Sequence, residues 1–161
     1  MCEYCGCRGV APIAELMDEH TALLDEAYYV RKALGENDRL GALLRLRTLV
    51  EHLQQHVHRE ETGVFTALRE TGEFLDEVEA LEGEHRSFDA MLEALDVESP
   101  DFAEGVATLL SELNQHVERE NLGVFPVSVV TLGARGWDVV DRAHAETPTF
   151  LGSNREAAAG S

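Results

Sequence analysis

The sequence lacks several features that are typical of membrane, secreted or nucleic-acid-binding proteins. It has no run of 18 apolar residues, so no membrane span is expected. The opening MCEYCGCRGV has neither the basic nor the apolar region of a secretory signal, and we therefore expect a cytoplasmic protein. Basic residues number 13 against 31 acidic ones, a net charge of −18. That charge repels nucleic acid and anionic lipid, so neither is expected as a partner.

Cysteine is also scarce. Only Cys2, Cys5 and Cys7 occur, and an odd, clustered set in a reducing compartment does not predict a disulfide framework. Their spacing would let them chelate one soft metal ion, with His144 as a weak candidate for the fourth ligand. The alternative is a flexible thiol cluster, and the sequence does not decide between the two.

No segment alternates apolar and polar residues with the period of a strand, so no sheet is expected. Apolar residues instead recur with helical period over four segments: 12–34, 39–70, 73–95 and 100–125. Long amphipathic helices with short connections predict an all-α fold, an antiparallel up-down-up-down four-helix bundle.

Capping signals place the ends of these helices. Asn37 or Asp38 can cap the second helix, and Ser99 followed by Pro100 is typical of the start of the fourth. The segment around Trp137 predicts an additional short C-terminal helix. The predicted organisation is a Cys-rich segment over 1–11, the bundle over 12–147 and a mobile tail over 148–161.

One stretch of the sequence is written twice. HVHREETGVF at 56–65 recurs as HVERENLGVF at 116–125, an offset of 60 residues. The pair EH at 19–20 recurs at 84–85, an offset of 65. These repeats indicate two related helix pairs. A pseudo-twofold axis along the bundle would bring the repeated segments face to face.

The repeated stretches contribute to a set of polar residues at apolar-stripe positions. Each of the four helices has one histidine there, and a glutamate follows two of these histidines by four residues, on the same helix face. One such histidine is usually a satisfied core residue, and one HxxxE can be a simple helix pair. The complete set is costly to bury unless its members are paired with one another or bound to metal. The predicted metal ligands are His20, His56, Glu60, His85, His116 and Glu120.

The types of ligand narrow the choice of metal. Imidazole nitrogens and carboxylates suit iron, manganese or zinc better than magnesium or calcium. Two carboxylates that face each other across a pseudo-twofold axis suggest bridges between two ions.

The order H…HxxxE…H…HxxxE resembles that of the hemerythrin-like HHE cation-binding domains, over about residues 12–140 and including LGVFP after the second HxxxE. The resemblance implies a four-helix bundle that holds two Fe ions in a non-haem di-iron centre, oxo- or hydroxo-bridged. Histidines would be terminal ligands, and Glu60 and Glu120 would bridge. Members of the family bind O2, sense O2 or iron, or react with peroxide or nitric oxide.

The sequence departs from the oxygen carriers of that family at one position. Asp89 stands four residues after the third-helix histidine, where the carriers have a fifth ligand histidine. Coordination positions therefore remain for water, a substrate or a further protein ligand. His52 and Glu112, one turn before the HxxxE histidines, are candidates for that ligand or for a hydrogen bond to one of the ligands. Alternatively, both are ordinary residues in solvent or at the boundary of the core.

The leading hypothesis is a di-iron oxidoreductase that binds and reduces a small oxidant (O2, peroxide or NO) with electrons from a donor that the sequence does not identify. The first alternative is a non-enzymatic O2 or iron sensor, and the second is a structural bundle loaded with a metal such as zinc. A ferritin-like centre would require ExxH spacing, whereas these helices carry HxxxE.

Overall fold

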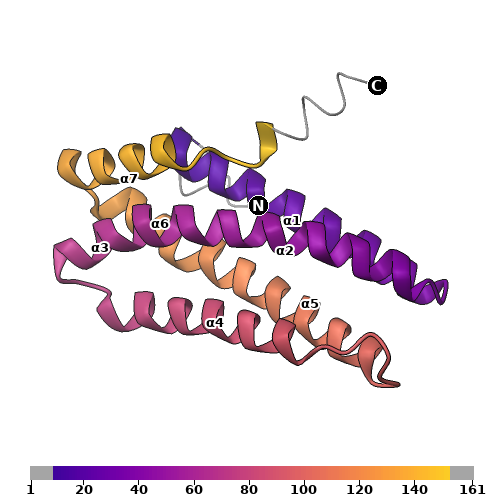
Figure 1. Ribbon diagram of the computed structural model, residues 1–161. Coiled ribbons are helices and arrows are strands. Elements are labelled where there is room, and N and C mark those ends of the chain that lie inside the picture. The colour runs from indigo at the N-terminus through magenta and orange to yellow at the C-terminus, as the bar shows by residue number, and fades with distance from the viewer. Residues whose placement is uncertain (1–8, 153–161) are drawn as a thin grey trace.

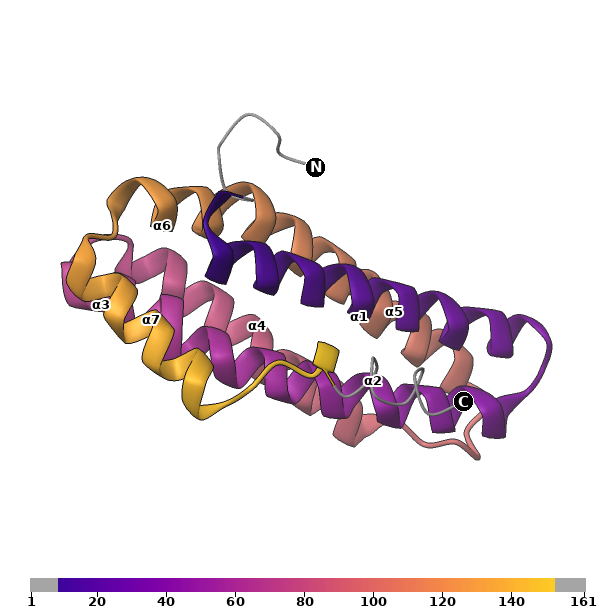
Figure 2. The ribbon, with the colours of Figure 1, turned by 90° about the horizontal axis from the view of Figure 1, so that it is seen from above.

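The computed structural model describes residues 9–152, and this part of the chain is helical without any strand (Figure 1). In chain order the elements are α1 (Ala11–Gly35), α2 (Arg39–Glu60), η2 (Glu61–Phe65), α3 (Thr66–Thr71), α4 (Leu75–Ala94), α5 (Phe102–Arg119), η3 (Glu120–Val124), α6 (Phe125–Thr131) and α7 (Ala134–Glu146). The long helices α1, α2, α4 and α5 lie lengthwise along one another (Figure 2). The predicted all-α class is confirmed. Within residues 9–152 no helix combines the length and apolar character needed to span a bilayer.

The predicted helix starts agree with the structure at α2 and differ at α5. The Asp38 side chain caps α2 by accepting a hydrogen bond from the Gly41 amide at 2.9 Å. The prediction for the fourth helix was two residues early, because α5 begins at Phe102. The hydroxyl of Ser99 instead accepts from the Asp101 amide at 3.1 Å, in a turn that precedes the helix.

The segments expected to be helical over 39–70 and 100–125 are helical, but neither is α-helical throughout. Each helix passes into a π-helical turn, η2 after α2 and η3 after α5. Such a turn is wider than an α-helical one and is common at functional sites. In η2 the Thr66 hydroxyl donates to the Glu61 carbonyl at 2.6 Å, which provides a hydrogen-bond partner within the widened turn. The sequence repeat is thus also a repeat of backbone structure.

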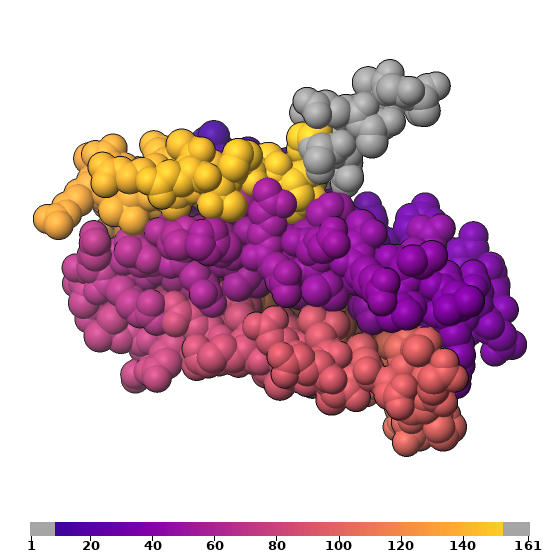
Figure 3. All heavy atoms as spheres, in the orientation of Figure 1, coloured from indigo at the N-terminus to yellow at the C-terminus, as the bar shows by residue number. Residues whose placement is uncertain are grey.

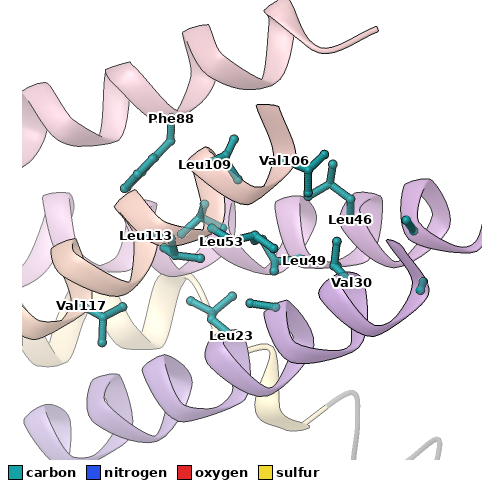
Figure 4. Packing of buried hydrophobic residues seen from close by; sticks show 14 of the residues in the cluster. Leu23, Val30, Leu46, Leu49, Leu53, Phe88, Val106, Leu109, Leu113 and Val117 are labelled. Atoms are coloured by element: carbon teal, nitrogen blue, oxygen red, sulfur yellow. The ribbon is translucent and has the colours of Figure 1, made fainter. Parts of the chain in front are cut away.

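The apolar core consists of two clusters. The larger includes Leu23, Leu49, Leu53, Phe88, Leu109 and Leu113, whose side chains point toward one another from four helices (Figure 4). The smaller includes Ile13, Leu16, Val64, Phe65, Leu81 and Phe125. On α1, His20 falls between Leu16 of the smaller cluster and Leu23 of the larger. Buried His56, His85 and His116 lie near the same boundary on the other long helices, so a polar layer divides the core.

The predicted C-terminal helix is present as α7, which lies against η2 and α3 (Figure 3). Gly63 of η2 faces α7, and a Cβ atom there would lie in contact with the Cβ of Ala143, at 3.4 Å. A mobile tail was expected from residue 148, but its first residues pack against the bundle. Phe150 is only 2% exposed, and its ring stacks on that of His52 with the centroids 4.4 Å apart. Residues 153–161 of that expected tail lie outside the described residues.

We expect the Phe150→Ala substitution to lower the free energy of unfolding by about 3 kcal/mol, because it removes a fully buried aromatic ring. Urea denaturation measures the change. Leu122→Ala is the control, since Leu122 is 66% exposed and its truncation should cost no more than about 0.5 kcal/mol. Equal losses for the two variants would contradict the packing of Phe150.

Candidate metal centre

The structure brings the six predicted metal ligands together in the polar layer. All six are buried, and none is more than 4% exposed. They form two overlapping groups, and within each group the potential ligand atoms lie within 4.8 Å of one another. We call the group with His20 and His56 the first half-site and the group with His85 and His116 the second half-site. Glu60 and Glu120 belong to both.

The Nε2 atoms of the four histidines face the shared carboxylates. Each glutamate is close to the histidine one turn before it on its own helix and to a histidine of the opposite half of the chain. The Nε2–Oε1 distances are 2.8 Å for His56–Glu60, 2.9 Å for His116–Glu120, 3.2 Å for His20–Glu120 and 3.8 Å for His85–Glu60. The geometry thus follows the pseudo-twofold relation that the repeats predict.

The other ring nitrogen of each histidine is bonded to an outer partner. The Nδ1 atoms donate from His20 to Asn121 (2.8 Å), from His56 to Glu19 (2.8 Å), from His85 to Glu61 (2.9 Å) and from His116 to Glu84 (2.5 Å). With the proton on Nδ1, the lone pair of a neutral imidazole sits on Nε2 and points into the centre. Outer partners of this kind fix the orientation of a ligating histidine and make it more basic.

Sequence reasoning missed these outer partners, although the repeats contained their signal. Glu19 and Glu84 are the glutamates of the two EH pairs, and Glu61 and Asn121 directly follow the two inward glutamates. Adjacent residues on a helix point about 100° apart. Each EH glutamate therefore bonds the histidine of the neighbouring helix rather than its own neighbour in sequence.

The outer partners of the two halves differ in burial. Arg59 is fully buried, and it donates to Glu19 at 3.1 Å and to the Thr147 carbonyl at 2.5 Å. Its counterpart in the repeat, Arg119, is 48% exposed and pairs with Glu84 at 2.8 Å. The asymmetry arises because α7 and the segment after it cover the first copy of the repeat.

The electrostatics of the centre follow from burial and from the closeness of its two carboxylates. Burial and the adjacent Glu120 raise the pKa of Glu60 well above the ordinary carboxyl range. Despite its own burial, Glu120 keeps a pKa well below that range, because protonated Glu60 and the His116 ring stabilise its charge. Although burial favours neutral imidazole, the ionised Glu120 carboxylate raises the pKa of His116 to about 9. Burial lowers the pKa values of His20 and His85.

This arrangement fits a bound cation. Within the described chain, all four oxygens of Glu60 and Glu120 and the Nε2 atoms of His20 and His56 lack a hydrogen-bond partner. Each unpaired buried group costs about 1–3 kcal/mol, and a cation would offset that cost by accepting their lone pairs. A mixed set of imidazole and carboxylate donors suits iron, manganese or zinc.

The candidates for an additional ligand lie outside both half-sites. Asp89 is exposed on α4, and Glu112 is half-buried on α5. The His52 Nδ1 atom bonds Glu26 at 2.5 Å while its ring stacks on Phe150. None of the three belongs to the two ligand groups that the described residues form.

The predicted thiol cluster of Cys2, Cys5 and Cys7 lies outside the described residues. Its candidate partner His144 is on α7, close to η2, where the ring faces Gly63. The role of these thiols stays a prediction.

Comparison with known proteins adds one finding. The family model of the hemerythrin HHE cation binding domain matches residues 11–128, a range that contains all six candidate ligands. No curated protein and no solved structure matches the chain.

The unequal burial of the two arginines gives a matched pair of stability predictions. Arg59→Met leaves the buried Glu19 carboxylate without its arginine, and we expect the free energy of unfolding to fall by about 3–5 kcal/mol. Arg119→Met breaks a partly exposed pair and should cost about 1 kcal/mol or less. Denaturant unfolding measures the free energy that each variant loses. Similar losses would contradict the unequal burial of the two arginines.

A second prediction concerns pH. Burial and the nearby Arg59 charge lower the pKa of His144 to about 4. Between pH 6.5 and 4 the unfolded chain therefore binds a proton that the folded chain does not, so this residue lowers stability as the pH falls. His144→Leu should reduce the loss of unfolding free energy between pH 7 and pH 5 by roughly 1–2 kcal/mol. An NMR signal of the wild-type His144 ring that titrates near pH 6.5 would refute the prediction.

Proposed function

The chain belongs to the hemerythrin HHE cation-binding domain family, and from that membership and its centre we propose a non-haem di-iron protein that binds and reduces small oxidants. The oxidants are O2, peroxide or nitric oxide, and the electrons come from an external donor. The proposed architecture is the antiparallel up-down-up-down four-helix bundle with α7 added. The proposed location is the cytoplasm.

The observation that carries the proposal is the sharing of two carboxylates by two pairs of histidines. One ion would not need six inward donors from four helices. In the proposal, His20 and His56 would hold one iron, His85 and His116 would hold the other, and both ions would share Glu60 and Glu120. Metal binding must displace the protons of Glu60 and His116, so affinity should fall at low pH.

Bound iron would supply the change of oxidation state that the reduction requires. The protein's own residues orient the ligands, offset charge and limit the access of water. The outer partners fix the orientation of each imidazole with its Nε2 atom toward the centre, and in the proposal the histidines serve as ligands and not as acid–base groups. The carboxylates of Glu60 and Glu120 would offset the positive charge of the bound ions. The apolar clusters above and below the layer limit the access of water.

The position of Asp89 favours reduction over reversible O2 carriage. The carriers have a histidine ligand at this place, whereas here an exposed aspartate lies outside the ligand groups. The chain would then leave a coordination position for peroxide or NO. An O2 or iron sensor and a structural zinc bundle remain the competing functions, and metal content together with reactivity separates them.

We expect protein purified from iron-supplemented cells to contain about two iron atoms per chain, the number a doubled half-site would hold. The double variant His56→Ala/His116→Ala removes one histidine from each half-site and should lose most of this iron. His58→Ala is the control, since His58 is exposed on the same helix as His56 and should leave the iron content unchanged. A double variant with a full complement of iron would refute the ligand assignment.

The same preparations test the reaction. Stopped-flow mixing of the reduced protein with O2 or with hydrogen peroxide should show consumption of the oxidant as the iron is oxidised, and an external electron donor in excess should sustain turnover. A long-lived oxygen adduct that is released intact under vacuum, without turnover of peroxide or NO, would favour the carrier or sensor function. Zinc as the only bound metal would favour the structural bundle.

A further inference from the structure

The two half-sites differ in access, and we infer that small uncharged oxidants reach the centre at the second half-site, through a groove between α2 and α4. This inference rests on the proposed di-iron function. It adds the route of entry, the half-site that the oxidant meets and the charge of the molecules that are admitted.

A groove of about 500 Å³ lies between α2 and α4. Its lining includes buried His85 of the second half-site and the outer partner of that histidine, Glu61. Exposed residues, including Gln54 and Asp89, line it as well. The groove therefore connects the surface with a candidate ligand, and it passes the position of Asp89, one helical turn from His85.

The pseudo-symmetric surface on the other side of the bundle is filled. The repeat offsets of 60 and 65 residues relate Val57 and Asp89 of the groove to Val117 and Leu24. Val117 is 3% exposed and belongs to the larger apolar cluster, and Leu24 packs against that cluster. Val57 is half-buried and Asp89 exposed. The sequence change from leucine to aspartate thus accompanies the opening of one side only.

The first half-site is also closed from outside. Glu19, the outer partner of His56, is fully buried beneath Arg59, which is itself tied to the carbonyl of Thr147. The equivalent outer partner in the second half-site, Glu84, is 28% exposed. Both comparisons identify the second half-site as the one nearer to solvent.

The charges of the groove select among small molecules. Its carboxylates are Glu61, Asp89 and Glu93, which outnumber the one exposed histidine of the lining, His58. The remaining wall includes the apolar Leu53, Val57 and Leu92. Together with the net charge of −18, these groups repel anions. Uncharged O2, hydrogen peroxide and NO meet no such barrier, whereas azide, nitrite or superoxide do.

The route is tested by a matched pair of tryptophan variants. Gln54 is exposed and lines the groove, and its repeat counterpart Asn114 is exposed on α5 and does not line it. We expect Gln54→Trp to slow the association of NO with the reduced iron protein about tenfold, because it narrows the approach, while Asn114→Trp changes the rate by less than about twofold. Stopped-flow absorbance gives the association rate, and iron analysis of each variant accompanies it.

Outcomes of this experiment separate the two proposals. Equal rates for both variants with two irons bound would overturn the groove as the route and leave the di-iron function intact. Wild-type protein that binds no iron would overturn the di-iron function itself.

Selection by charge has its own test. Azide should associate slowly with the oxidised wild-type protein, and faster as ionic strength rises, because salt screens the repulsion. In Asp89→Asn/Glu93→Gln, the ratio of the azide rate to the NO rate should rise about threefold or more, with a weaker dependence on salt. An unchanged ratio would show that the acidic residues of the groove do not select.

Discussion

The structure depends on a single constraint, the burial of six polar side chains in the middle of an apolar bundle. Four imidazoles and two carboxylates occupy the space between the two apolar clusters, with at most 4% exposure. Such groups are tolerated only when every polar atom has a partner. The Nδ1 atoms find partners in Glu19, Glu61, Glu84 and Asn121. The Nε2 atoms of His20 and His56 and the oxygens of Glu60 and Glu120 are left for a cation.

Duplication explains how a small chain arranges this centre, and the loss of symmetry explains how its halves come to differ. Each half supplies a histidine, an HxxxE pair, an outer glutamate and a π-helical turn. The segment that follows the second half then covers the first. This segment buries Arg59, and its own Phe150 packs into the core. Arg119 and the groove beside His85 stay open to solvent. A symmetric set of ligands thus sits in an asymmetric environment.

Much of the fold was predictable because helical period and capping are local properties. The apolar stripes, the cap at Asp38 and the short helix around Trp137 all follow from residues close together in the chain. The placement of the six inward residues also followed, since a residue three or four positions from a buried leucine lies on the same helix face. Their role as iron ligands stays a prediction, as does the reaction with oxidants.

The sequence by itself determined the helices, the repeat and the inward positions, because each depends on spacing along one helix. Only the tertiary structure decided the outer partners, the burial of Arg59, the packing of Phe150 and the groove between α2 and α4. These depend on contacts between residues far apart in the chain, such as Arg59 with the Thr147 carbonyl, 88 positions away. Spacing carries no signal for such pairs, and two copies of one motif acquire different surroundings only when the chain has folded over one of them.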